Sequence, residues 1–127
     1  MRSLYAAWAR GDFSSTDWAD PDIEYVQVDG PTPGTWRGVP AMGRAWGEAI
    51  AEFAEFHVEA EEIRPVGEDR FLVLTHNTGR GRTSGFALDE IATRGANVLH
   101  VRDGKVTRLA LYFDRDRAIE DLEGGER

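Results

Sequence analysis

The chain contains no cysteine among its 127 residues. A disulfide framework, a zinc site built on thiolates and a cysteine nucleophile are therefore excluded. Basic residues are also in deficit, with 15 Lys and Arg against 23 Asp and Glu, which gives a formal net charge of −8. Because these basic residues are scattered and the chain as a whole would repel phosphate backbones, we expect no nucleic-acid partner.

Long apolar runs are missing as well. No segment approaches the roughly 20 apolar residues that span a membrane, and residues 1–12 lack the apolar centre of a signal peptide. We therefore expect a cytoplasmic protein without membrane contact. Histidines occur only at positions 57, 76 and 100, without metal-ligand spacing, so we expect no metal and no cofactor.

The length and the apolar content of the chain limit the number of domains it can form. With 41% hydrophobic residues, 127 residues suffice for one domain, residues 1–127, with a core of its own. Periodicity predicts helices over residues 2–10 and 39–56, a short helix ending at Trp18, and a terminal helix or tail at residues 118–122. Strand patterns cover residues 22–29, 57–64, 70–78, 86–102 and 105–113. This order predicts an α+β domain in which one curved antiparallel sheet wraps around helices.

The clearest local unit is a long β-hairpin centred on Asp103-Gly104. Both residues tolerate the positive φ angles of a tight two-residue turn, and they separate two alternating apolar runs. Such a turn pairs His100 with Thr107 and Val98 with Leu109.

This register determines which side chains share a face of the hairpin. His100 is predicted on the most apolar face of the last strand, which carries Leu109, Leu111 and Phe113. Asp114 has the opposite parity. We expect the apolar face to be turned towards the helices.

The apolar pattern of residues 70–78 predicts that the back of the sheet is also packed against another part of the protein. Both alternating sets of positions begin with apolar residues, namely Phe71, Leu72, Val73 and Leu74. A strand buried on both faces needs a second packing partner. In so small a chain we expect a second subunit to supply it, which predicts a homodimer through the back of the sheet.

Five motifs distributed along the chain carry a family resemblance. They are L-Y-A-A-W-A-R-G-D at 4–12, D-P-D-I-E-Y at 20–25, P-G-T-W-R-G at 33–38, G-R-G-R-T-S-G at 79–85 and R-D-G-K-V-T-R-L-A-L-Y-F-D-R at 102–115. In order and spacing they resemble the SnoaL-like polyketide cyclases, the ketosteroid isomerases and nuclear transport factor 2. The resemblance implies a cone-shaped α+β fold with a central, largely apolar pocket.

Ketosteroid isomerase uses an Asp base opposite an oxyanion hole formed by a Tyr and a protonated Asp. By spacing from Gly38, the resemblance assigns the base to Asp29. It assigns the Tyr to Leu4 and the second Asp to Val98, with Tyr5 one residue from the required position. Both hydrogen-bond donors are then missing, which argues against steroid isomerisation by that mechanism.

SnoaL-like cyclases resemble the chain in its last hairpin. Their proposed acid/base groups, a His on the penultimate strand and an Asp at the end of the last, correspond to His100 and Asp114. Because the parity of Asp114 differs, Asp29 is the better companion for His100. Epoxide hydrolases of the same fold use an Asp-Arg-Asp set, for which Asp29 and Arg94 would supply only a part.

Each of these residues also has a plainer interpretation. His100 can be a half-buried strand histidine whose ring is hydrogen-bonded to a backbone carbonyl. Asp29 can be a turn residue whose side chain bonds its own backbone, and Asp114 can be the cap of the terminal helix. The turn with Arg80 and Arg82 is either a solvated tip or a contact for an anion.

The resulting hypothesis is a protein that binds a small apolar or amphipathic molecule with a ring or an acyl group. Cofactor-free acid/base chemistry, as in an isomerase, an aldol-type cyclase or a dehydratase, would use Asp29, His100 and Asp114. A non-catalytic ligand-binding or structural dimeric domain is the alternative. The predicted pocket wall consists of Leu4, Trp8, Tyr25, Trp36, Trp46, Phe53, Val98, Leu109, Leu111 and Phe113.

Overall fold

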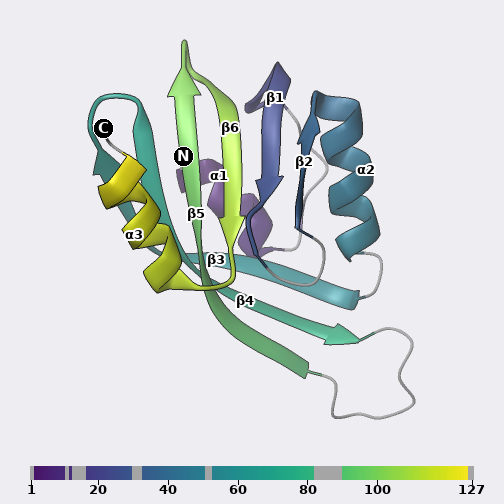
Figure 1. Ribbon diagram of the computed structural model, residues 1–127. Coiled ribbons are helices and arrows are strands. Elements are labelled where there is room, and N and C mark those ends of the chain that lie inside the picture. The colour runs from purple at the N-terminus through teal and green to yellow at the C-terminus, as the bar shows by residue number, and fades with distance from the viewer. Residues whose placement is uncertain are drawn as a thin grey trace.

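A computed structural model describes residues 2–10, 12, 17–29, 33–50, 53–81 and 90–125. Three helices and six strands lie in this part of the chain (Figure 1). In chain order they are α1 (Arg2–Ala9), β1 (Ala19–Gln27), β2 (Gly34–Arg37), α2 (Val39–Ile50), β3 (Phe53–Val66), β4 (Arg70–Gly81), β5 (Glu90–Arg102), β6 (Lys105–Tyr112) and α3 (Arg115–Gly125). None of the described helices is long and apolar enough to cross a membrane.

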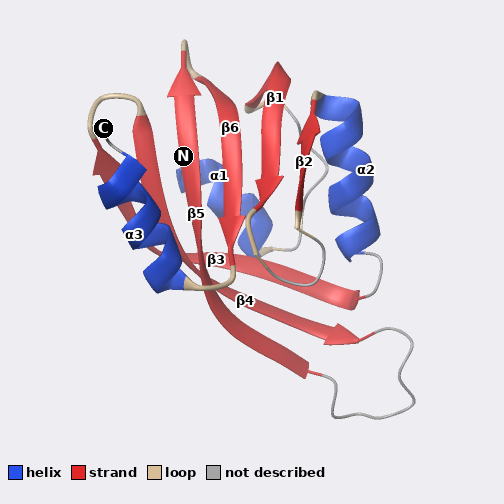
Figure 2. Cartoon of the chain, viewed as in Figure 1, coloured by secondary structure: helices blue, strands red, loops and turns tan. Residues whose placement is uncertain are grey.

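All six strands form one curved, open sheet in the order β2-β1-β6-β5-β4-β3 (Figure 2). The predicted α+β fold with a curved sheet is therefore confirmed. One detail differs, because β1 pairs with β6 in parallel while the other neighbouring pairs are antiparallel. The hairpin to β2 occupies one edge of β1, so the last strand of the chain docks on the other edge, running in the same direction as β1.

The short helix predicted to end at Trp18 lies mostly outside the described residues, and Asp17 and Trp18 form a turn before β1. Pro21 lies inside β1, where the register shifts between Ala19 and Glu24 and the ladder does not need an N–H at the proline. One predicted helix boundary is wrong. The helix expected to continue to residue 56 ends at Ile50, and Phe53 begins β3. Pairing along the whole length of β4 stabilises β3, and this tertiary contact overrides the helical spacing of Phe53. The side chain of Phe53 lies outside the described residues.

The sheet separates two apolar clusters. We call inner face the side that carries Val73, Leu99 and Leu109 and packs against α1 and α2. We call outer face the side that carries Leu72 and Val98 and packs against α3. Figure 1 shows α1 and α3 on opposite sides of the sheet. The cover that the sequence assigned to a second subunit is thus supplied over this part of the outer face by α3 of the same chain.

The predicted turn between β5 and β6 is confirmed, and the predicted register beyond it is wrong. Asp103 and Gly104 have φ angles of 53° and 80°, as a tight primed turn requires. A β-bulge follows, because Val101 pairs with Val106 whereas the next residue back, His100, pairs with Arg108. Thr107 is the extra residue, and every pair beyond it is shifted by one position.

Gly95 on β5 allows a close approach where β6 leaves the sheet. A Cβ atom at this position would lie 2.5 Å from the carbonyl oxygen of Tyr112. The guanidinium of Arg115, at the start of α3, donates hydrogen bonds to the carbonyl oxygens of Gly95 and Thr75 (3.0 and 2.8 Å). The same guanidinium pairs with Glu61, the bulged residue of β3. Arg115 therefore ties α3 to three strands.

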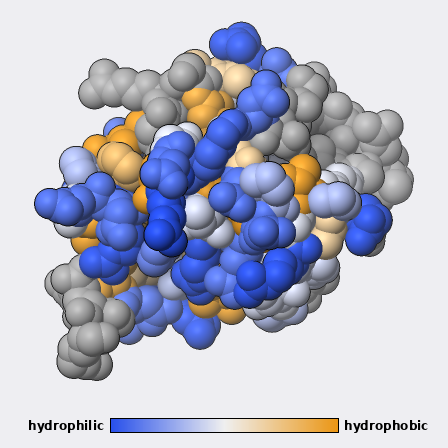
Figure 3. Space-filling model, turned by 90° about the horizontal axis from the view of Figure 1, so that it is seen from above, coloured by the Kyte–Doolittle hydropathy of each residue, from blue (hydrophilic) through white to orange (hydrophobic). Residues whose placement is uncertain are grey.

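The view from above shows one end of the molecule (Figure 3). Hydrophilic residues dominate the face seen there, and apolar residues appear in small, separate groups. The larger apolar cluster lies in the interior, on the inner face of the sheet.

Candidate site on the inner face

A buried tyrosine–asparagine pair connects α1 to the middle of the sheet. The side-chain amide of Asn97 donates a hydrogen bond to the Tyr5 hydroxyl oxygen over 2.7 Å. Tyr5 and Asn97 are only 3% and 6% exposed. Burial raises the pKa of Tyr5, so the hydroxyl keeps its proton at any physiological pH. Within the described residues the structure gives that proton no acceptor.

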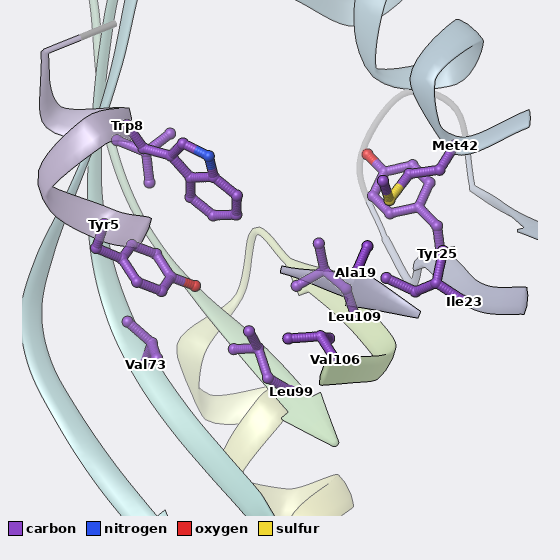
Figure 4. Packing of buried hydrophobic residues seen from close by; sticks show 11 residues of the cluster. Tyr5, Trp8, Ala19, Ile23, Tyr25, Met42, Val73, Leu99, Val106 and Leu109 are labelled. Atoms are coloured by element: carbon purple, nitrogen blue, oxygen red, sulfur yellow. The ribbon is translucent and has the colours of Figure 1, made fainter. Parts of the chain in front are cut away.

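A second pair of the same kind lies on β1. The Gln27 side-chain amide donates to the Tyr25 hydroxyl oxygen over 2.9 Å, and Tyr25 is 1% exposed. Burial raises the pKa of Tyr25 to about 12, so this hydroxyl is also neutral. In Figure 4 the hydroxyl oxygens of Tyr5 and Tyr25 point into the interior from opposite sides, one from α1 and one from β1.

Aromatic rings connect the two tyrosines along the inner face. Ring centroids are 4.8 Å apart for Tyr5 and Trp8, 5.0 Å for Trp8 and Trp46, and 5.6 Å for Trp46 and Tyr25. Trp36 extends the array by contacting Tyr25 at 5.7 Å. These separations are those of favourable edge-on and offset aromatic pairs. Four predicted wall residues, Trp8, Tyr25, Trp36 and Trp46, thus lie in one cluster.

Three more predicted wall residues lie on the same face, and they differ in exposure. Leu109 is fully buried in the inner cluster, whereas Leu4 and Leu111 are partly buried against it. Trp36 and Trp46 are also only partly buried. The aromatic array therefore has an accessible side, and Leu111 forms part of that surface.

Val98 and His100 lie on the outer face, contrary to the prediction. Because Thr107 is an extra residue in β6, Val98 pairs with Ala110 and His100 with Arg108. A shift of one residue moves a strand's side chains to the opposite face relative to its partner. Asn97, not Val98, consequently faces the helices on the inner side.

His100 lies among charged residues on the outer face. It pairs with Arg70 on β4 and with Arg108 on β6, and Arg108 forms an ion pair with Glu24 at 3.0 Å. Partial burial, followed by the charges of Arg108 and Arg70, lowers the pKa of His100, while Asp69 and Glu24 act weakly in the opposite direction. His100 is thus separated by the sheet from the aromatic array.

Asp29 joins the end of β1 to the end of β6. Its two carboxylate oxygens accept hydrogen bonds from the backbone N–H groups of Phe113 and Asp114, at 2.6 and 3.3 Å. The sequence predicted either a base or a side chain bonded within its own turn, and the structure shows a contact to a different strand. Phe113 is 58% exposed and lies in the bend after β6, so its prediction as a pocket wall is wrong.

Asp114 is the cap of α3. Its Oδ1 accepts hydrogen bonds from the N–H groups of Asp116 and Arg117, at 3.0 and 3.4 Å. This is the geometry of a helix N-cap, which the sequence had offered as the plainer interpretation. The structure therefore brings Asp29 next to the backbone of Asp114, whereas His100 lies apart from both, beside Arg108 on the outer face.

Comparisons with known proteins agree with this architecture. The model of the SnoaL-like domain matches residues 1–109. The chain belongs to the SnoaL-like domain family. No curated protein matches its sequence.

Solved structures of the same fold are similar to this SnoaL-like protein at low sequence identity. A protein of unknown function with a cystatin-like fold from Xanthomonas campestris has a TM-score of 0.73 and 21% identity, covering 95% of this chain and 92% of its own. TerC, co-crystallised with polyporic acid, has a TM-score of 0.72 and 21% identity, covering 96% and 94%. A ketosteroid isomerase-like protein from Catenulispora acidiphila, in complex with trimethylamine, has a TM-score of 0.70 and 17% identity, covering 87% and 82%.

Metal ligands do not gather in the described part of this SnoaL-like protein, where no three His, Asp or Glu side chains lie together. Arg80 belongs to β4, but its side chain and all of Arg82 lie outside the described residues. Arg94 pairs with Glu61 on the surface at 3.5 Å. The Asp-Arg-Asp set considered for a hydrolase is therefore not assembled from Asp29 and Arg94.

Sequence reasoning missed Tyr5, Asn97 and Gln27 in this SnoaL-like protein. Tyr5 lies three residues before Trp8 and Leu4 four residues before it, so both fit the helix face of Trp8 and spacing alone does not choose between them. Gln27 has the same strand parity as Ile23 and Tyr25, which indicated the inner face. Asn97 carried no such signal, because its face depends on the bulge.

Proposed function

We propose that this SnoaL-like protein binds a small ring-containing or acyl molecule on the inner face of its sheet. The observation that carries the proposal is the buried Tyr5 hydroxyl, whose oxygen accepts a hydrogen bond from the Asn97 amide and whose own proton has no acceptor among the described residues. Such a group binds a carbonyl or phenol oxygen of a ligand and fixes the orientation of that ligand. A buried donor without an acceptor is costly, and a ligand oxygen removes this cost.

The surroundings of Tyr5 favour an apolar ring as the body of the ligand. Trp8 and Trp46 continue the ring array from Tyr5, and Leu111 presents a partly exposed aliphatic surface nearby on the same face. Small-molecule sites are typically lined by aromatic and aliphatic side chains with a few polar groups that set orientation. Tyr5 supplies such a polar group here.

The relatives support a small-molecule role for the fold. TerC was co-crystallised with polyporic acid, and the protein from Catenulispora acidiphila was solved with trimethylamine. Two further similar structures carry the description of polyketide cyclases, both marked as unproven, from Mesorhizobium loti and Sinorhizobium meliloti. Their ligands and activities belong to those proteins, and the shared fold makes a ligand of comparable size a reasonable proposal for this chain.

Tyr5 and Asn97 lie next to the positions that the resemblance to ketosteroid isomerase assigns to hydrogen-bond donors. Spacing assigned the two donors of that enzyme to Leu4 and Val98, and the inward-facing neighbours of these residues are Tyr5 and Asn97. A tyrosine hydroxyl is therefore available close to the expected position. The proposal favours binding over acid/base catalysis, because Asp29, His100 and Asp114 are engaged elsewhere.

Titration with 2-naphthol, an apolar ring system with one oxygen, tests this proposal by isothermal calorimetry. We expect the wild-type protein to bind it. We expect Tyr5→Phe to weaken the binding about fivefold, because a single net hydrogen bond contributes roughly 1 kcal/mol.

Tyr112→Phe is the matched control. The Tyr112 hydroxyl donates to Asp121 on α3 and lies on the outer face, so its removal is expected to leave 2-naphthol affinity unchanged. The proposal is overturned if wild-type protein does not bind 2-naphthol, or if Tyr5→Phe and Tyr112→Phe bind it equally well.

A further inference from the structure

We infer that the inner face selects a neutral ligand with two oxygens, one near each end of a flat ring system, held by Tyr5 and Tyr25. This inference rests on the proposed function, since it adds a second polar contact to the same site. It goes further by assigning a specificity-determining role to Tyr25 and Gln27.

The two tyrosines are held in the same way. Each tyrosine is almost fully buried, and each hydroxyl oxygen accepts a hydrogen bond from a side-chain amide, Asn97 for Tyr5 and Gln27 for Tyr25. Accepting from an amide directs the remaining lone pair and the hydroxyl proton away from that amide. For both hydroxyls, the described residues offer no acceptor for this proton.

The sheet register sets the spacing between the two anchors. Leu111 pairs with Asn97 on one side and with Gln27 on the other, so the two amides lie in one row across the sheet. Neighbouring strands are about 4.8 Å apart, which places the two amide-bearing residues about 10 Å from each other. Leu111, between them, is only partly buried and provides an apolar surface against which a ring can lie.

The charge of the site argues for a neutral ligand. Apart from tyrosine hydroxyls and the Trp8 indole N–H, Thr75 and Asn97 supply the only polar groups among the described buried side chains, and none of these groups is ionised. An ionised ligand group placed beside Tyr5 or Tyr25 would have no buried counter-charge there, and burial of an unpaired charge is strongly unfavourable. Carbonyl and phenol oxygens accept a hydrogen bond without this cost.

Comparison of 2-naphthol with 2,6-dihydroxynaphthalene tests the second anchor. The two compounds share the ring system, and the second carries an oxygen at each end. Its two equivalent orientations alone give a twofold advantage. We expect wild-type protein to bind the diol about tenfold more tightly than 2-naphthol, because the hydrogen bond to Tyr25 contributes a further factor of about five.

Tyr25→Phe is expected to reduce the advantage of the diol over 2-naphthol to about twofold, because only the hydrogen bond to Tyr5 remains. Gln27→Met tests the same anchor without altering the ring array, and it should also reduce the advantage because the Tyr25 hydroxyl loses its orienting donor. Tyr112→Phe, on the outer face, should keep the wild-type ratio. Circular dichroism and melting temperatures verify that each variant is folded.

The outcomes separate this inference from the proposed function. If wild-type protein binds both compounds with a ratio of two or less, the two-oxygen inference is wrong and the proposed function stands. A ratio near ten that persists in folded Tyr25→Phe and Gln27→Met likewise overturns the inference. If neither compound binds, the proposed function fails and the inference fails with it.

Discussion

His100 occupies a half-buried position on the outer face, where two arginines flank it across the sheet. Burial and the charges of Arg108 and Arg70 lower its pKa in the folded chain below the ordinary value near 6.5. The unfolded chain then binds more protons than the folded chain once the pH falls below that value. The free energy of unfolding should therefore decrease as the pH falls through this range towards the lower folded pKa.

His100→Gln is expected to flatten this pH dependence, because the substitution removes the group that gains a proton on unfolding. Urea unfolding at pH 7.5 and pH 5.5 measures the effect. His76→Gln is the matched substitution on the neighbouring strand, where His76 pairs with Glu59 and Arg94 instead of two arginines. If the free energy of unfolding of His100→Gln changed between pH 7.5 and pH 5.5 as much as that of the wild-type protein, the role assigned to His100 would be contradicted.

At the scale of the secondary-structure elements, Asp114 caps the first turn of α3, and two side chains attach this helix to the sheet. Arg115 donates to carbonyl oxygens of β4 and β5, and Asp121 accepts a hydrogen bond from Tyr112 of β6 at 2.9 Å. Ala118 packs into the outer cluster between them. The helix is therefore an integral part of the outer face.

Asp114→Ala should lower the free energy of unfolding by about 1 kcal/mol, the usual effect of losing an N-cap. The first N–H groups of α3, at Asp116 and Arg117, lose their acceptor. Asp114→Asn retains an acceptor oxygen and is expected to stay within a few tenths of the wild-type value. Chemical denaturation compares the three proteins, and equal losses in both variants would argue that the carboxylate charge, not the cap, is responsible.

At the scale of the whole molecule, the sheet divides the protein into two apolar clusters with different roles. The inner cluster holds the proposed site, and the outer cluster is closed over by α3. The homodimer through the back of the sheet stays a prediction. Where α3 covers Leu72 and Val98, a second subunit is no longer needed to bury them.

Ala118→Asp should destabilise the protein without abolishing the proposed binding. Ala118 is fully buried in the outer cluster, and a carboxylate there would have to displace α3 or become protonated, at an expected cost of about 2 kcal/mol or more. Affinity for 2-naphthol below the unfolding transition should remain within twofold of wild type. Glu120→Gln, an exposed change on the same helix, is the control, and a selective loss of binding in Ala118→Asp would show that the two clusters are coupled.

Local signals were sufficient for most of the fold. Asp103 and Gly104 were predicted to form the turn because a tight primed turn needs two positive φ angles. Alternation of apolar residues predicted most strands, and the helical periodicity that begins at residue 39 predicted α2. These features depend on neighbours within a few residues, so they can be read without knowledge of distant contacts.

Long-range contacts decided the composition of the candidate site. The bulge at Thr107 exchanges Val98 for Asn97 on the inner face and removes His100 from it, and a single unpaired residue leaves no mark in an alternating pattern. Phe53 begins a strand because β4 is there to pair with it. The hairpin was therefore determined by its sequence, whereas the face that each hairpin side chain occupies was decided by strand pairing and by the helices packed on either side.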